Sequence, residues 1–282
     1  MIEKKNTKNV DPRTVSDFGS EWSVFDQSDL THHELQIAFE EYFSLVDWGQ
    51  ISDSPVIMDV GCGSGRWAVF VAPKAGKMLL VDPAQKALDV ARIKMSAFKN
   101  CEFHLGTTEE LPVEDDSCDF VYSLGVLHHI PDTYSGIEDC VRKLKPGAPF
   151  LVYLYYRFDN RPLWFRALWQ ISNLARLIFA RLPFQAKHFS SAIIAGLIYL
   201  PLARTSRFAE KCGMNVSVWP LSFYRQSSFY RMRTDALDRF GTRLEHRFTQ
   251  DEIQRMLTSA GLEKISFRET EPFWCAIGYK TR

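Results

Sequence analysis

The feature that most constrains the fold is the stretch DVGCGSGRW, Asp59 to Trp67, which follows the apolar run VIMDV and opens a helical pattern. Glycines directly after a buried strand let the backbone approach a ligand, and the helix that follows offers unpaired N–H groups. The glycines stand at positions 61, 63 and 65, whereas a dinucleotide fingerprint needs glycine at position 66, which is arginine. The stretch therefore predicts a ligand-binding turn and disfavours a pyrophosphate cofactor.

From Pro55 onward short apolar runs alternate with helical segments, a pattern typical of βαβ units around a parallel sheet. The predicted strands cover 56–60, 78–82, 101–106, 118–125 and 150–156. After about ninety residues of different character the pattern resumes at Thr249, with a helix that ends at Gly261 and a closing pair of strands in KISFRE and FWCAIGY. The sequence predicts an α/β sheet interrupted by a mainly helical insertion.

The helix starts follow from capping patterns. Ser135 with Glu138 and Thr249 with Glu252 have the spacing of capping boxes. Thr242 with Glu245 has the same spacing just after Gly241, and it predicts a new helical start there.

The 282 residues are 46% hydrophobic, ample for a core. They divide into an N-terminal helical cap (1–54), a sheet core (55–156), a helical lid (157–247), and a helix with a strand pair that completes the core (248–282). The start of the chain has no signal-peptide pattern, and six scattered cysteines predict buried thiols of a reducing cytosol. The apolar run 192–203 is too short to span a membrane and contains Pro201, so we expect a cytoplasmic protein, with contact at a membrane surface left open.

A further acidic residue supports the ligand site. Asp82 ends the second predicted strand, 23 positions after Asp59, where a carboxylate can accept both hydroxyls of a ribose. The combination of DVGCGSG, LLVDP and GTTEELPVEDDSCDFVYSLGVLHHIPD resembles the class I S-adenosylmethionine (SAM)-dependent methyltransferases. The resemblance is good over 55–156 and extends by layout over 249–280. It implies a Rossmann-like seven-stranded sheet with helices on both faces, a reversed last strand, SAM as cofactor and S-adenosylhomocysteine as product.

The resemblance also implies a cofactor site. In the family the glycine turn faces the methionine part of SAM, the acidic residue after the second strand binds the ribose, and the fourth strand ends beside the transferred methyl. The positions so assigned are Asp59, Gly61, Cys62, Gly63, Asp82, Thr107, Thr108, Glu109, Ser123, Leu124 and His128. Threonines at 107 and 108 depart from the family's acidic adenine ligand, because a hydroxyl is a weaker acceptor than a carboxylate, and Glu109 is the alternative.

Methyl transfer from a sulfonium is an in-line displacement, so the enzyme must hold acceptor and methyl together in a dry pocket. The insertion is placed to form the lid, and Phe18 and Trp22 of the N-terminal segment can fold over the cofactor. A hydroxyl acceptor needs a base, for which histidine suits pH 7. The candidates are His128 and His129, followed by Tyr156, Asp159 and His246. No cluster with metal-ligand spacing is present in the sequence, so no metal is expected.

Positive charge is concentrated in the predicted lid. Between 157 and 247 fifteen basic residues, thirteen of them arginine, face five acidic ones, although the whole chain is neutral. The arginines either pair within the protein or bind an anionic acceptor through their planar forks. The substrate-binding candidates are Tyr156, Arg157, Arg239, Arg243 and His246.

These observations predict O-methylation of an anionic small molecule, a glycan or a lipid-linked acceptor. The alternatives are C-methylation of a quinone-like or lipid substrate, RNA methylation, and SAM binding without catalysis. Nucleic acid is disfavoured because the fourth strand ends in SLGV rather than the Asn/Asp-Pro-Pro-Tyr/Phe motif of base amino methyltransferases, and we identify no RNA-binding module beside the sheet.

Overall fold

The computed structural model describes residues 9–24, 32–217 and 219–282. The chain divides into two compact units. The first, here called the sheet unit, comprises 1–26, 38–157 and 244–282, and the second, the helical unit, comprises 27–37 and 158–243. Parts of the predicted N-terminal cap, 1–8 and 25–31, lie outside the described residues.

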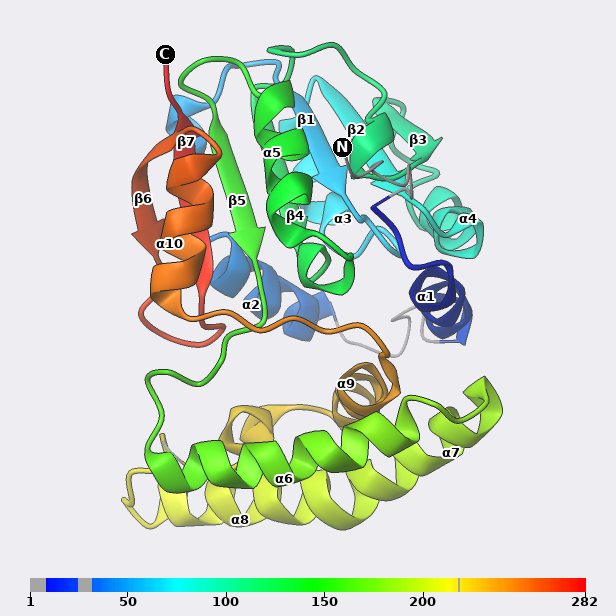
Figure 1. Cartoon of the computed structure of the whole chain (residues 1–282), viewed down its shortest axis with the longest axis vertical. Helices are drawn as coiled ribbons and strands as arrows, with labels where there is room; N and C mark the ends of the chain where they lie inside the picture. The colour runs from blue at the N-terminus through cyan, green and yellow to red at the C-terminus, as the bar shows by residue number, and fades with distance from the viewer. Residues whose placement is uncertain (1–8, 25–31, 218) are drawn as a thin grey trace, which may run out of the picture. The chain divides into compact units, whose positions relative to one another are not determined.

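The sheet unit is built on one seven-stranded sheet of order β3-β2-β1-β4-β5-β7-β6 (Figure 1). The first five strands are parallel, whereas β7 runs antiparallel to both β5 and β6, which confirms the predicted fold class. Strand order reverses between β1 and β4, and open α/β sheets bind ligands at the carboxyl ends of strands at such a switch point. The strands are β1 (Val56–Val60), β2 (Lys77–Asp82), β3 (Cys101–Leu105), β4 (Phe120–Leu124), β5 (Pro149–Tyr153), β6 (Leu262–Phe267) and β7 (Cys275–Lys280).

Helices cover both faces of this sheet. Because successive strand residues point to opposite faces, Met58 belongs to the core cluster that includes residues of α5 and α10, while its neighbour Ile57 belongs to the one that includes residues of α2, α3 and α4. Figure 1 shows α5 and α10 in front of the strands and α3 behind them. The helices of this unit are α1 (Pro12–Val24), α2 (His32–Tyr42, in this unit from Ala38), α3 (Ala68–Val71), α4 (Gln85–Lys94), α5 (Thr133–Lys143) and α10 (Gln250–Ser259), with short 3-10 turns η1 (Trp48–Gln50), η2 (Ala72–Lys74), η3 (Thr108–Glu110) and η4 (Leu127–His129).

The capping predictions have different outcomes. Thr249 and Glu252 form the predicted capping box at the start of α10. The capping box of Ser135 and Glu138 is wrong, because Asp132 caps α5 by accepting from the Ser135 N–H at 3.0 Å. The carboxylate of Asp132 is the better N-cap acceptor, and it begins the helix three residues earlier.

The helical unit consists of long helices around a small core. Its elements are α6 (Leu163–Phe179), α7 (Phe184–Ile194), the π-turn η5 (Ala195–Tyr199), α8 (Leu200–Lys211), the 3-10 turn η6 (Ser222–Gln226) and α9 (Phe229–Gly241). The core joins Ile194, Ala195, Tyr199 and Ala203 to Met232 and Ala236 of α9. The new helical start predicted at Thr242 is wrong: residues 242–248 are not helical, and the Thr242 hydroxyl donates back to the Asp238 carbonyl at 2.7 Å.

Pro201 does not interrupt the helix in which it lies. It lies just after the π-turn η5, where the regular i→i−4 hydrogen bonds are already interrupted, and Phe184–Lys211 stays helical over 28 residues. By length and composition this helix could cross a membrane, and 33% of its most apolar window is buried within the protein. The prediction from the apolar run alone underestimated this element.

Candidate cofactor and methyl-transfer site

The glycine turn has the backbone geometry that only glycine adopts without strain. Gly61, Gly63 and Gly65 have φ values of 78°, 52° and 74°. A Cβ on Gly61 would lie 2.3 Å from the side chain of Val126, which follows β4. The Gly61 and Cys62 N–H groups both donate to the Val81 carbonyl, at 2.8 and 3.1 Å. The turn is thus fixed between the ends of β1, β2 and β4.

Asp82 joins this turn to the end of β2. One carboxylate oxygen accepts from the Gly63 N–H and the other from the Ala84 N–H, both at 2.8 Å. Burial raises the pKa of Asp82 to about 6, against the lowering effect of these two hydrogen bonds. A carboxylate accepts about four hydrogen bonds, so each oxygen retains a lone pair for a ribose hydroxyl.

Asp59 lies inside the strand end beneath the turn. It is buried, and its Oδ2 accepts from the Tyr122 hydroxyl at 2.9 Å. Burial raises the pKa of Asp59 to about 8; the Tyr122 hydrogen bond lowers it, and the charge of Asp82 adds to the rise. The Cys62 thiol is buried as well, and burial raises its pKa well above the usual value, so it is not a nucleophile.

The remaining cofactor candidates lie in two places, after β3 and near the end of β4. The Thr107 hydroxyl is buried and has no hydrogen-bond partner among the described residues, so it can serve an incoming ligand. Thr108 is buried in η3, and Glu109 Oε2 accepts from the Asn9 N–H at 3.0 Å. By contrast, the buried Ser123 hydroxyl donates to the Val60 carbonyl at 2.8 Å, which ties β4 to β1.

The two candidate histidines follow β4 in η4 and differ in environment. His128 is fully buried, its ring stacks on Tyr155 at 3.8 Å between centroids, and neither ring nitrogen has a hydrogen-bond partner among the described residues. Burial, followed by the charges of His129, Arg247 and His246, lowers its pKa well below the usual value, so His128 is neutral. His129 Nδ1 lies 2.7 Å from the Leu244 carbonyl. A carbonyl only accepts, so Nδ1 carries a proton, and in the neutral ring the basic lone pair is then on Nε2.

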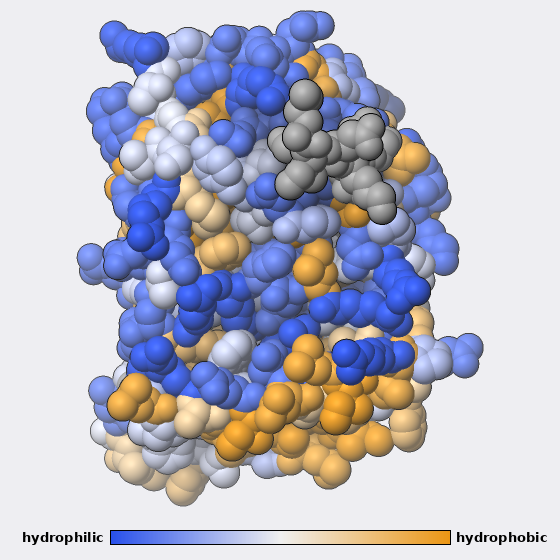
Figure 2. Space-filling view, viewed as in Figure 1, coloured by the Kyte–Doolittle hydropathy of each residue, from blue (hydrophilic) through white to orange (hydrophobic). Residues whose placement is uncertain are grey.

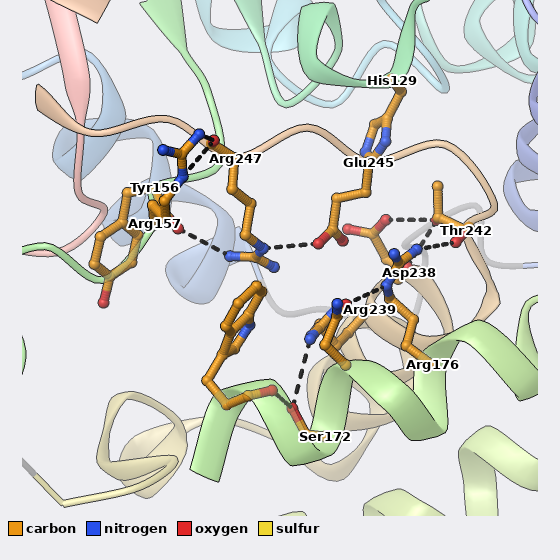
Figure 3. Close-up of polar contacts among 12 residues, drawn as sticks. His129, Tyr156, Arg157, Ser172, Arg176, Asp238, Arg239, Thr242, Glu245 and Arg247 are labelled. Atoms are coloured by element: carbon orange, nitrogen blue, oxygen red, sulfur yellow. Dashed lines mark hydrogen bonds and ion pairs between the residues drawn. The ribbon is translucent and has the colours of Figure 1, made fainter. Parts of the chain in front are cut away.

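Residues 244–248, which rejoin the sheet unit after the helical unit, form a wall of this site. The His246 N–H donates to the His128 carbonyl and the Phe248 N–H to the Tyr155 carbonyl, both at 2.9 Å. Arg247 lies over the Tyr155 ring at 4.9 Å and pairs with the buried Glu245 at 2.7 Å (Figure 3). Sequence reasoning missed Tyr155, Glu245 and Val126, since contacts between distant segments of the chain leave no local pattern.

Helix α1 covers the same edge of the sheet unit. A Cβ on Gly63 would lie 3.2 Å from Trp22 Nε1, and the Phe18 ring lies 5.0 Å from that of His129. The two aromatic residues expected to cover the cofactor therefore contact two candidate site residues. Of the other candidates, Leu124 ends β4, and Tyr156 packs on Phe273 and Trp274.

The arginines of the predicted lid are largely engaged by their own unit. In the sheet unit, Arg157 pairs with Glu252 at 3.0 Å and donates to the Arg247 carbonyl. In the helical unit, Arg239 lies over Trp169 at 5.5 Å, and the buried Arg176 donates to the Thr242 carbonyl at 2.9 Å (Figure 3). Arg243 ends this unit, and Asp159 is exposed near its start. The charge excess therefore gives little support to an anionic ligand.

The residues present fit SAM. The turn leaves no room for a side chain at Gly61, Asp82 retains acceptor capacity beside it, and Thr107 offers an unpartnered hydroxyl. These positions lie after β1, β2 and β3, and His129 follows β4 across the switch point. Among the residues described, no group of three or more His, Cys, Asp or Glu could hold a metal ion.

The sheet order, with its reversed β7, is that of a class I methyltransferase domain. Residues 58–152 match the model of the family described as a methyltransferase domain. The chain therefore carries a methyltransferase domain of the SAM-dependent class, and SAM is its cofactor.

Comparisons with known proteins also find methyltransferases. The chain is 28% identical over 153 residues to a ubiquinone biosynthesis O-methyltransferase of Idiomarina loihiensis (51% of this chain, 61% of the relative), and 31% identical over 94 residues to a demethylmenaquinone methyltransferase of Staphylococcus aureus (32% and 39%). The alignments span between 37% and 61% of the first curated relatives.

Among solved structures, one complex between the Haloferax volcanii Trm112 methyltransferase activator and a protein described as a methyltransferase superposes with a TM-score of 0.54. The alignment has 13% identity and covers 94% of this chain and 98% of the other. It supports the fold.

Proposed function

We propose that the protein transfers the methyl group of SAM to a hydroxyl oxygen of a small, apolar, phenol-like acceptor. The observation that carries the proposal is His129, whose Nδ1–H donates to Leu244 and whose Nε2 therefore holds a lone pair at the end of β4. A neutral imidazole in this tautomer can accept the hydroxyl proton during transfer. SAM, when bound, supplies the electrophilic methyl of its sulfonium.

The chain's own residues position the reactants and exclude water. The glycine turn and Asp82 would hold the cofactor, and the rings of Phe18, Tyr155 and His128 surround His129 with apolar surface. His128 is fully buried between Tyr155 and His129, so it serves as packing for its neighbour rather than as the base. A site walled by aromatic rings favours an aromatic acceptor over a glycan.

The contacts of the arginines and the names of the relatives both bear on the choice of acceptor. Arginines that donate to carbonyls of their own unit do not require an anion, which weakens the case for an anionic small molecule, glycan or lipid-linked anion. A ubiquinone-pathway name among the relatives favours a phenol with an apolar tail. The demethylmenaquinone relative keeps C-methylation as the second candidate.

The test is a methyl-transfer assay with labelled SAM and soluble short-tailed phenols and quinols, with the product bond assigned by NMR. The variant His129→Asn keeps a donor for the Leu244 carbonyl but has no base, so kcat should fall by roughly 10²- to 10⁴-fold while the Kd for SAM is unchanged. The pH–rate profile should lose its histidine limb. His33→Asn, at an exposed histidine of α2 that is not a candidate site residue, is the control.

Two outcomes would contradict the proposal. A product methylated on carbon would select the second candidate, since no hydroxyl proton then needs His129. A His129→Asn enzyme with normal kcat and an unchanged pH profile would exclude this residue as the base.

A further inference from the structure

The helical unit exposes a continuous apolar surface. In α6 the exposed large apolar residues recur at helical spacing, and a second row runs along the helix Phe184–Lys211, where the step of five residues from Leu197 to Leu202 spans the π-turn η5. Figure 2 shows apolar side chains gathered over these helices. We call the following residues the apolar face: Leu163, Trp164, Leu168, Ile171, Leu174, Leu177, Ile178, Phe189, Ile193, Leu197, Ile198, Leu202 and Phe208.

The exposure of this face is far beyond that of scattered surface residues. Ile178, Phe189, Leu197 and Phe208 expose 68%, 68%, 74% and 71% of their surface. Contiguous apolar patches of this kind mark sites where a protein meets another apolar phase or a partner.

The positive charge of these helices indicates which partner the apolar face binds. Between 163 and 211 the chain carries five arginines and two lysines but only one acidic residue, Glu210, which pairs with Arg225 at 2.9 Å. Arg166 of α6 and Lys211 of α8 are exposed, and so is Arg181 in the turn between α6 and α7. Amphipathic helices that combine bulky apolar residues with cations bind the interface of anionic lipid bilayers. A second copy of this chain would bring the same positive charges together, which disfavours self-association.

The residues on the buried side of the helix Phe184–Lys211 indicate whether this helix would lie on a bilayer or span it. Lys187 and Ser206 are buried on that side, and Ala195 and Ala203 pack against Met232 of α9. Helix α9 carries five charged residues, Arg231, Arg233, Asp235, Asp238 and Arg239. Insertion across the bilayer would strip this packing or draw those charges into hydrocarbon, which is costly.

We propose that the apolar face of α6, α7 and α8 docks the protein on the surface of an anionic membrane, with the helices parallel to the bilayer plane. The inference goes beyond the proposed reaction and rests on the helical unit alone. It assigns the face a lipid surface as its partner.

The test is flotation of the full chain with vesicles of phosphatidylcholine alone or mixed with phosphatidylglycerol, in the absence of SAM and acceptor. Binding should require phosphatidylglycerol and weaken with salt. Phe189→Ser with Leu197→Ser should reduce partitioning by at least about tenfold. Ile93→Ser with Leu105→Ser, which removes two comparably exposed apolar residues from the sheet unit, should leave it unchanged. Arg166→Gln with Arg181→Gln should cost about fivefold per arginine.

A dye that reports polarity gives an independent readout. On Leu197→Cys in a Cys212→Ser background, its emission should shift to the blue with anionic vesicles, and on Ile93→Cys it should not. Circular dichroism confirms that each variant is folded. Because these assays contain no methyl donor, their failure is distinct from failure of methyl transfer.

Three results would overturn the inference. One is equal vesicle binding by the face variant and the control. Another is a dimer in light scattering that the face variant abolishes while vesicles are not bound. The third is protein that high salt cannot release and only detergent extracts, which would show a spanning helix.

Discussion

The two units use apolar residues in opposite ways. The sheet unit buries clusters of 21 and 19 apolar residues on the two faces of its sheet, whereas the core of the helical unit contains six. Most of the exposed large apolar side chains of the described chain belong to the helical unit. An amphipathic helix normally turns its apolar side toward the core of its own domain. Here α6 turns much of it outward, so its sequence serves an external contact rather than internal stability.

The largest expected difference between the units is the cost of removing a phenyl ring. Phe150 is fully buried in β5, so Phe150→Ala should lower the free energy of unfolding of the sheet unit by about 4 kcal/mol. Phe189→Ala, at a residue 68% exposed in the helical unit, should change stability by less than about 0.5 kcal/mol. Urea unfolding followed by circular dichroism measures both. Equal losses would show that the apolar face is covered within the protein.

A second test concerns the glycine turn. Gly61→Ala should cost about 3 kcal/mol, because the residue has φ 78° and its Cβ would lie 2.3 Å from Val126. The control is Gly147→Ala, with φ 81° but no atom within 4 Å of its Cβ, which should cost only the backbone strain of about 1 kcal/mol. Calorimetric titration should also show loss of SAM binding in the first variant alone. Normal SAM binding by Gly61→Ala would contradict the cofactor site.

A smaller effect is expected at the buried arginine of the helical unit. Arg176 donates to the Thr242 carbonyl at 2.9 Å and to Asn173 Oδ1 at 2.8 Å. Arg176→Gln should leave a buried carbonyl unsatisfied and cost about 2 kcal/mol. Arg166→Gln, an exposed position on the same helix, should be nearly neutral in thermal unfolding. If both variants were neutral, the Arg176 contacts would not support the view that lid arginines are structural.

Much of the fold could be predicted because its signals are local. A glycine turn after VIMDV, an acid after LLV and the capping box at Thr249 each lie within a few residues of the element they specify. The prediction at Pro201 was wrong because the preceding π-turn already interrupts the regular hydrogen bonds that a proline removes, and the sequence gives no signal of that turn. Local patterns set element type more reliably than element ends.

The site was less predictable, since its walls come from distant segments. The tautomer of His129 depends on Leu244, and the stack on His128 depends on Tyr155, and neither pairing has a sequence signature. The arginine count likewise carried no information about partners: Arg204 donates to the Arg225 and Ser227 carbonyls, which any residue type supplies. The residue types predict the positive charge of this segment, but only the fold shows which groups the arginine side chains bind.

The effect that depends most on conditions is the pH dependence of stability set by Asp59. Burial raises its pKa to about 8 in the folded protein, whereas an unfolded aspartate titrates near 3.8. Between these values the native state binds the proton more tightly, so this group makes stability fall as pH rises toward about 8. Asp82, with a pKa of about 6, acts in the same direction only up to that pH. From pH 6 to 8 we therefore assign the fall in stability to Asp59.

The variant Asp59→Asn cannot ionise at this position and can still accept from Tyr122. Without SAM, its thermal unfolding temperature should match that of the wild type near pH 4 and exceed it increasingly toward pH 8. Parallel profiles for the two proteins would show that the carboxyl is already ionised at neutral pH.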